Sequence, residues 1–160
     1  MFSASLIGAL ATLALVQAQA FPGTWGFADF QGTTFHLVDG QANDATPVQG
    51  FSNNVPTLNS QWMLVNQSAP NTYQIINLNP AGTFLGYSTL TTGGQAIRSQ
   101  LAGNRQAANW IFTPPSGQLI EVSSGLAVTS YATGLSGSHP FTLEPADAND
   151  PHQFFELIPA

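Results

Sequence analysis

The sequence predicts an all-β fold built from three repeats of about 45 residues. An aromatic residue preceded by Asn or Gln recurs along the chain at separations of 48 and 45 residues. These aromatics are Trp62 in Asn59-Ser60-Gln61-Trp62, Trp110 after Asn109, and Phe155 in Gln153-Phe154-Phe155. A spacing that recurs in this way is typical of one supersecondary unit repeated three times.

A second motif recurs with the first: in each copy a glycine is followed closely by an apolar residue. The three segments are Gly32-Thr33-Thr34-Phe35, Gly82-Thr83-Phe84-Leu85 and Gly125-Leu126-Ala127-Val128. The recurring aromatic follows 27 residues after Phe35, 26 after Phe84 and 29 after Leu126. The internal spacing of the unit therefore repeats as well as its end.

Short runs of apolar and β-branched residues predict the strands, because each run is bounded by Gly, Pro, Asn or Ser. No stretch after residue 20 shows a 3.6-residue apolar period over ten or more residues, so no long helix is expected. In chain order the predicted strands are 34–38, 61–65, 73–78, 83–87, 96–101, 110–113, 119–122, 126–130, 141–144 and 154–158.

Repeats of this length hold about four strands each, roughly twelve in total. A propeller usually needs at least four blades, so three copies favour a β-trefoil with pseudo-threefold symmetry. We expect one domain over residues 21–160, with repeats at about 21–68, 69–115 and 116–160. Trp62, Trp110 and Phe155 are then expected in the core, where large rings contribute most burial.

The first twenty residues resemble a secretory leader. They contain no charged side chain, run through an apolar stretch from Leu6 to Val16, and end in the small residues Ala18 and Ala20. This pattern predicts a signal peptide over residues 1–20, and about eleven apolar residues are too few to span a bilayer. We therefore expect a secreted, extracellular protein.

The amino-acid composition limits the classes of binding partner that can be expected. Only 6% of residues are charged, the only bases are Arg98 and Arg105, and the formal net charge is −6. A phosphate backbone or an anionic membrane would be repelled, so neither nucleic acid nor membrane is expected as a partner. With no Cys, thiol chemistry and disulfides are excluded. An uncharged polar surface suits neutral sugars or simple solubility.

The chain resembles the ricin B-type β-trefoil lectins, also described as family 13 carbohydrate-binding modules. Each repeat of that family carries a Gln-x-Trp element, and the resemblance covers about residues 21–160. Only Gln153-Phe154-Phe155 keeps the Gln, with Phe in place of Trp, whereas Ser60 and Ala108 stand at the Gln position of the other repeats. The disulfides common in the family are absent.

The resemblance implies a sugar site made of an early Asp, a polar residue with an aromatic platform, and an Asn ahead of the Gln-x-Trp. In repeat one, Asp39, Gln49, Phe51 and Asn59 fill these roles. Such groups accept and donate hydrogen bonds to hydroxyls, while a ring packs on the C–H face of a pyranose. The alternative is that Asp39 forms a turn with the glycine after it, that Phe51 is core, and that the two amides satisfy loop backbone groups.

Repeats two and three are expected to be degenerate as sugar sites. Ser88 and Ser130 appear at the positions matching Asp39. The middle segment of repeat two, 97–100, has no aromatic platform, while that of repeat three holds Phe141 and Leu143. Repeat one is therefore the expected site.

Catalysis is poorly supported by the sequence. No Ser lies in a Gly-x-Ser-x-Gly elbow, and His36, His139 and His152 are isolated from one another without a metal-binding motif. The acid-rich segment 144–152 falls short of a calcium loop and is predicted to be a solvated loop. We expect no enzyme activity and no cofactor.

These observations favour a secreted, monomeric lectin that binds a galactose-type or related neutral glycan. The main alternative is a β-trefoil protease inhibitor that presents a loop such as 50–58 or 93–100. A third alternative is an extracellular interaction protein whose sugar sites have decayed. Asn66, in the one N-x-S/T sequon after the leader, is a candidate N-glycosylation site.

Overall fold

The structure, a computed structural model, describes residues 21, 23–52, 57–88, 91–92, 95–96, 99–131 and 139–160. The predicted signal peptide, residues 1–20, lies outside these ranges. The described chain is all-β apart from single-turn 3-10 helices, which are η1 (Val38–Gly40), η2 (Leu58–Ser60) and η3 (Pro151–Gln153). No helix within these ranges is long and apolar enough to cross a membrane.

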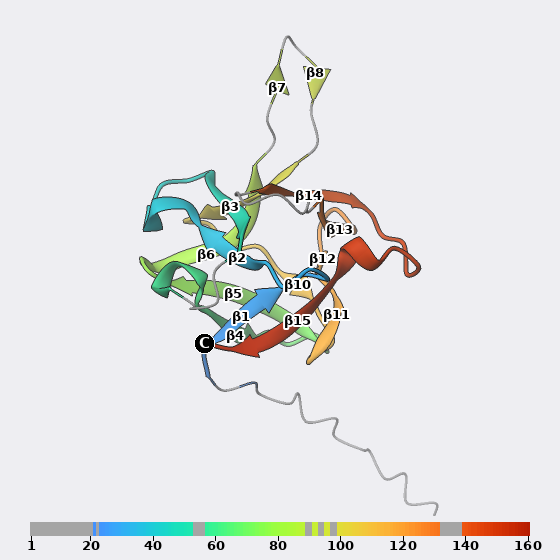
Figure 1. Cartoon of the computed structure of the whole chain (residues 1–160), viewed down its shortest axis with the longest axis horizontal. Coiled ribbons are helices and arrows are strands. Elements are labelled where there is room, and N and C mark those ends of the chain that lie inside the picture. Colours follow the sequence, from blue (N-terminus) through green and yellow to red (C-terminus); the bar gives the residue numbers. More distant parts are fainter. Residues whose placement is uncertain are drawn as a thin grey trace, which may run out of the picture.

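The strands fall into three successive groups (Figure 1). Repeat one comprises β1 (Trp25–Ala28), β2 (Thr34–Leu37), β3 (Thr46–Phe51) and β4 (Trp62–Asn66). Repeat two comprises β5 (Thr72–Leu78), β6 (Ala81–Ser88), β9 (Gln100–Asn104) and β10 (Trp110–Ile111), with a projecting hairpin of β7 (Thr91–Thr92) and β8 (Gln95–Ala96). Repeat three comprises β11 (Ser116–Gln118), β12 (Ile120–Glu121), β13 (Leu126–Ser130), β14 (His139–Pro145) and β15 (Phe154–Pro159).

The first and last strands of the repeats close into a barrel. β1 pairs with β15 and β4, β4 with β5, and β5 with β10. β10 then pairs with β12, while β11 pairs with β15, so β11 and β12 share one strand position. All these pairs are antiparallel, and the strands of the ring close on themselves, so the barrel itself has no free edge.

The second and third strands of each repeat form a hairpin that caps the barrel. The three hairpins are β2–β3, β6–β9 and β13–β14. Their third strands, β3, β9 and β14, pair with one another around the pseudo-threefold axis. A closed barrel capped by three hairpins is a β-trefoil, and the predicted fold class is confirmed.

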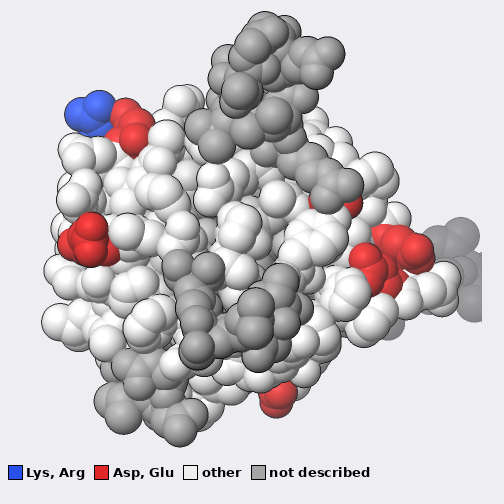
Figure 2. All heavy atoms as spheres, turned by 45° about the horizontal axis from the view of Figure 1, so that its top comes forward, with Lys and Arg blue, Asp and Glu red and all other residues white. Residues whose placement is uncertain are grey.

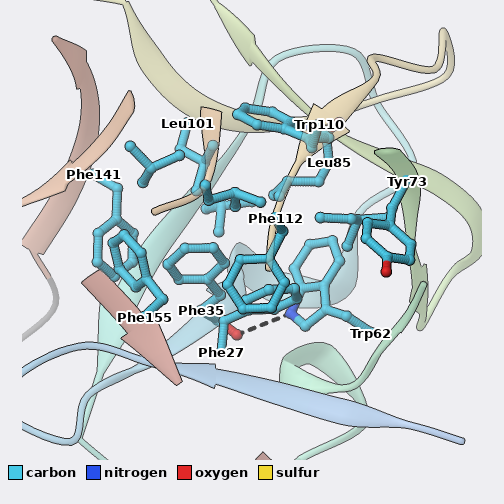
Figure 3. Packing of buried hydrophobic residues seen from close by; sticks show 14 of the residues in the cluster. Phe27, Phe35, Trp62, Tyr73, Leu85, Leu101, Trp110, Phe112, Phe141 and Phe155 are labelled. Carbon is cyan, nitrogen blue, oxygen red and sulfur yellow. Dashed lines mark hydrogen bonds between the residues drawn. The ribbon is translucent and has the colours of Figure 1, made fainter. Parts of the chain in front are cut away.

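Aromatic rings fill the barrel (Figure 3). Trp62, Trp110 and Phe155 are at most 1% exposed. The indole Nε1 of Trp62 donates to the Phe35 carbonyl at 3.2 Å, and that of Trp110 donates to the Leu85 carbonyl at 3.0 Å. The N–H of each indole thus binds a backbone carbonyl on the second strand of its own repeat.

These hydrogen bonds correct the predicted register of the glycine landmark. Phe35, Leu85 and Val128 are all fully buried, and each lies three residues after a glycine with positive φ. The predicted equivalents Phe84 and Leu126 are only partly buried. A slip of one residue moves a side chain to the other face of a strand, and Phe84 was misassigned for that reason.

In the barrel and its cap, strands β1, β3 and β11 were not predicted, and neither was the two-residue strand β7 of the projecting hairpin. They were missed because β1 and β11 are short and glycine-containing, and because β3 contains Pro47 and Gly50, which sequence patterns associate with loops. The tertiary structure requires Gly50, since a Cβ there would lie 2.2 Å from the ring of His139. Close packing of β3 against β14 therefore overrides local strand propensity.

Candidate functional site

The β2–β3 hairpin of repeat one turns one face to the core and the other to the surface. Val48 is fully buried, whereas Gln49 and Phe51 alternate with the buried positions and lie on the outer face. His36 pairs directly with Gln49 across the hairpin. Phe51 is 38% exposed, and its ring stacks on His36 with centroids 5.0 Å apart. Phe51 is therefore a surface platform rather than a core residue.

Asp39 follows the hairpin's first strand in the short helix η1, where its side chain is exposed. Its φ of 53° is in the left-handed region, which Asp tolerates better than most residues. Burial lowers the pKa of His36, and the negative charge of Asp39 opposes this only in part. The imidazole is therefore neutral at neutral pH, which makes it a hydrogen-bonding and stacking group.

Asn59, in the short helix η2 before β4, lies close to the turn that holds Asp39. Its side-chain Oδ1 accepts a hydrogen bond from Asn79 Nδ2 at 2.6 Å, and its backbone carbonyl accepts one from Asn77 at 3.0 Å. A Cβ added to Gly40 would lie 2.9 Å from Asn59 Oδ1, so Asn59 lies directly beside the residue after Asp39. This close approach requires glycine at position 40.

Of the four residues named from the sequence, Phe51 stacks on His36 and Gln49 pairs with it across the hairpin. Asn59 lies beside Gly40, the residue after Asp39, and the Nδ1 of His36 lies 3.1 Å from the hydroxyl of Ser60, the residue after Asn59. Sequence reasoning treated His36 as isolated from the other histidines and did not consider Asn79. Alternation along β2 could have placed His36 on the same face as Gln49, whereas the position of Asn79 depends on tertiary contact.

Strand pairing identifies the corresponding positions in the other repeats. Phe35, Leu85 and Val128 pair with Gly50, Gly103 and Leu143, respectively. The next residue along the third strand is Phe51 in repeat one, Asn104 in repeat two and Glu144 in repeat three. Neither counterpart is aromatic, so at this position only repeat one has an exposed ring.

The counterparts of Asp39, counted from the same buried residues, are positions 89 and 132, outside the described residues. The match of Asp39 to Ser88 and Ser130 was therefore wrong in register. Ser130 is fully buried and pairs with Phe141 in the β13–β14 ladder, which is the place of Leu37 in repeat one. It cannot face a ligand at the surface.

A hollow of about 1040 Å³ is lined mainly by residues of repeat two. Gly86 and Ala108 line it at the positions of His36 and Ser60. The exposed ion pair between Arg105 and Asp44, 2.7 Å apart, lies at its edge. The lining includes neither Asp39 nor Phe51, so the candidate site is separate from this hollow and lies on an open face.

A Ser, a His and an Asp also meet in the interior, but their arrangement is structural. Asp29 Oδ2 accepts hydrogen bonds directly from Ser130 Oγ and Thr33 Oγ1, both at 2.6 Å. His139 Nε2 lies 3.6 Å from the same oxygen and 3.4 Å from Ser130 Oγ. A catalytic triad needs the base between nucleophile and acid, and here the carboxylate binds the hydroxyl itself. Ser130 is moreover inaccessible to solvent.

The acid-rich segment before β15 stabilises its own loop. Asp150 accepts from the His152 backbone N–H at 2.9 Å and caps η3, while Asp147 Oδ1 accepts from the Asn149 backbone N–H at 2.9 Å. Among the described residues no group of three or more His, Asp or Glu is arranged to hold a metal ion. Asn66, the candidate glycosylation site, is the partly exposed last residue of β4.

The fold defines the chain as a β-trefoil, and similar solved structures include several lectins. The Rhizoctonia solani agglutinin is 17% identical with a TM-score of 0.68, over 92% of this chain and 100% of that one. The Macrolepiota procera ricin B-like lectin, solved in complex with lactose, is 14% identical with a TM-score of 0.67, over 90% and 99%. The designed threefold protein ThreeFoil is 14% identical with a TM-score of 0.67, over 86% and 99%.

No protein-family model matches the chain, and no curated protein does. At such low identities the structural likeness shows a shared architecture. The chain therefore has the β-trefoil fold of the ricin B-like lectins, and its structural neighbours include lectins solved with bound saccharides.

Proposed function

We propose that this protein is a secreted lectin that binds a galactose-type or related neutral glycan through the outer face of repeat one. The observation that carries the proposal is the exposed ring of Phe51, which stacks on His36. On the same hairpin Asp39 precedes Gly40, which lies beside Asn59. The apolar face of a pyranose packs on such a ring, while a carboxylate and amides bind its hydroxyls.

The structural neighbours support this ligand class. The Macrolepiota procera lectin was solved with lactose, the Polyporus squamosus lectin with Neu5Aca2-6Galb1-4GlcNAc, and SeviL with the asialo-GM1 saccharide. One open site of this kind is expected to bind a single sugar with a Kd of about 1 mM, or about −4 kcal/mol. We infer that the protein acts by binding rather than by catalysis, and outside the cell because of its leader-like N-terminus.

A glycan array followed by calorimetric titration with lactose tests the proposal. Asp39→Asn is the sharper substitution than Asp39→Ala, because Asn also tolerates the left-handed backbone at φ 53°. We expect Asp39→Asn and Phe51→Ala each to weaken lactose binding by about tenfold or more. Both side chains are exposed, so circular dichroism should show an unchanged fold.

Matched controls separate the site from general surface effects. Glu144→Gln removes one negative charge elsewhere, and Met63→Ala removes an apolar side chain that is 38% exposed, as Phe51 is. Neither should change lactose binding by more than about twofold. If wild type binds no glycan on the array, or if the Asp39 and Phe51 variants bind as wild type does, the proposal is wrong, and protease-inhibition assays become the next measurement.

A further inference from the structure

A second hollow, of about 420 Å³, lies at the barrel strands β15 and β11. Phe154 and Glu156 on β15 line it, with Ser116 of β11 opposite Glu156 in the ladder. Phe30 on the β1–β2 turn and Asn149 on the loop before η3 also line it. The hollow shares no residue with the repeat-one site, and its volume is within the range of small-ligand sites.

Two phenylalanine rings are exposed in this hollow and held in place. Phe30 is 45% exposed and Phe154 36% exposed. The turn that carries Phe30 is closed by two backbone hydrogen bonds of 2.9 Å between its ends, and the Phe30 ring contacts the ring of His152 at 4.7 Å. The aromatic surface is therefore preorganised rather than presented by a free loop.

The fold does not require these residues. Counted from Trp62, Trp110 and Phe155, the positions equivalent to Phe154 hold Gln61 and Asn109. Those equivalent to Glu156 hold Met63 and Ile111. An aromatic ring beside a carboxylate at this place is thus specific to repeat three, whereas trefoil symmetry alone would allow an amide and an aliphatic side chain.

The surroundings of the hollow are negative. Two acids, Asp29 and Glu156, line it, and the segment 147–156 adds Asp147 and Asp150 and contains no Lys or Arg. Arg105, the one Arg with a described side chain, is paired with Asp44 elsewhere. Figure 2 shows the blue atoms directly against red ones, while other red groups on that face have no blue neighbour.

We propose that this hollow is a second binding site and that it takes a cationic amino-sugar unit of a glycan. Aromatic faces attract an ammonium group through their quadrupole and also pack on the C–H face of a pyranose. Glu156 supplies the countercharge, and Asn149 and Ser116 offer hydrogen bonds to hydroxyls. One ring-sized ligand with a single positive charge thus matches the shape, the aromatic lining and the charge together.

Calorimetric titration with a tetramer of β-1,4-linked glucosamine tests the proposal, beside the same tetramer fully N-acetylated. We expect the charged tetramer to bind at least about fivefold more tightly than the acetylated one, since acetylation removes the cation. Glu156→Gln and Phe154→Ala should each weaken it by about fivefold or more, and raised salt should weaken wild-type binding.

The controls keep the result specific to the hollow. Glu144→Gln removes a charge from a residue that does not line the hollow, and Ile111→Ala removes an exposed apolar side chain at the place equivalent to Glu156. Both should bind the charged tetramer as wild type does. Equal binding of the two tetramers, or unchanged binding by Glu156→Gln, overturns the proposal. A lysine-rich peptide that displaces the charged tetramer and binds more tightly would assign the hollow to a protein cation instead.

This site does not depend on repeat one. Failure of lactose binding leaves the glucosamine titration unaffected, and the reverse also holds, because the two sets of variants affect different residues. Thermal melts of all variants check that lost binding is not lost folding.

Discussion

The three repeats share one backbone arrangement but differ in a pair of side chains at equivalent positions beneath each hairpin. Repeat one places His36 against Ser60, and repeat three places Thr129 against Gln153, whose Nε2 donates to the Thr129 hydroxyl at 3.2 Å. Repeat two has only Gly86 and Ala108 at these positions. Gly86 and Ala108 both line the large hollow, and the side chain of Asn104 occupies the space beside Gly86.

Substitution of Trp110 tests the assignment of the core, again at the scale of single residues. Trp110→Ala should lower the free energy of unfolding by about 3–5 kcal/mol, because it removes a fully buried ring and leaves a cavity. The adjacent Ile111 is 41% exposed, so Ile111→Ala should cost less than about 1 kcal/mol. Urea denaturation of both variants measures the difference, and similar losses would contradict the assigned core.

Asp29 anchors a buried polar network between repeats one and three. Its two carboxylate oxygens accept four hydrogen bonds, from the Gln31 and Thr33 backbone N–H groups and from the Thr33 and Ser130 hydroxyls. Asp29→Asn turns one acceptor into a donor facing donors and should cost about 2–3 kcal/mol. Ser130→Ala removes only one donor and should cost less. Thermal unfolding that ranks the two variants in the opposite order would refute this network as described.

At the scale of the element, each β-hairpin begins at a glycine in the left-handed region. Gly82 has φ 89° and open space around its Cα, so a substitution there reports backbone strain alone. Gly82→Ala should destabilise the protein by about 1 kcal/mol, and Gly82→Asn by less, because Asn tolerates positive φ better. Equal denaturation midpoints for wild type and Gly82→Ala would show that the turn adapts without cost.

Glu121 closes the turn between β12 and β13. Burial alone would raise the pKa of Glu121, but hydrogen bonds from the backbone and hydroxyl groups of Ser123 and Ser124 oppose it and the net pKa is lowered. A lowered pKa stabilises the fold fully above the unfolded value of 4.5, and this stability is lost as pH falls through the folded pKa.

The pH dependence of unfolding checks this assignment. Glu121→Gln should cost about 1–2 kcal/mol at neutral pH. Below the usual Glu range the difference from wild type should shrink, because the wild-type carboxyl is then protonated as well. Glu156→Gln, at an exposed position, serves as the control and should show little change in either range. A constant gap at all pH values would mean that the ionised form contributes nothing.

At the scale of the whole molecule, the net charge is −6 and there are few bases. The effect of salt on affinity should therefore distinguish the two proposed sites. The repeat-one site recognises a neutral sugar, so raising salt from about 50 to about 500 mM should change lactose affinity by less than about twofold. The barrel hollow should lose affinity for its cationic ligand over the same range. Parallel titrations at the two salt concentrations measure both, and a strong salt effect on lactose would point to a charged group in the repeat-one ligand.

The predicted fold followed from the sequence because its signals are local. Recurrence of Trp62, Trp110 and Phe155 at similar spacings required only counting, and the glycine landmarks lie within a few residues of the buried positions they mark. The error at Phe84 was a shift by one residue, which counting cannot detect, because strand faces alternate and only the indole hydrogen bond of Trp110 identifies Leu85 as the buried residue.

The sequence by itself determined the fold class, the threefold repeat and the low proportion of charged residues, because these depend on composition and on spacing along the chain. Only the tertiary structure decided that Phe51 stacks on His36 at the surface, that Asn59 lies beside Gly40, and that Phe30 and Phe154 line one hollow. Phe30 and Phe154 are far apart in the chain and become neighbours because barrel closure pairs β1 with β15. Side-chain sets of this kind arise from non-local packing, which no local sequence pattern encodes.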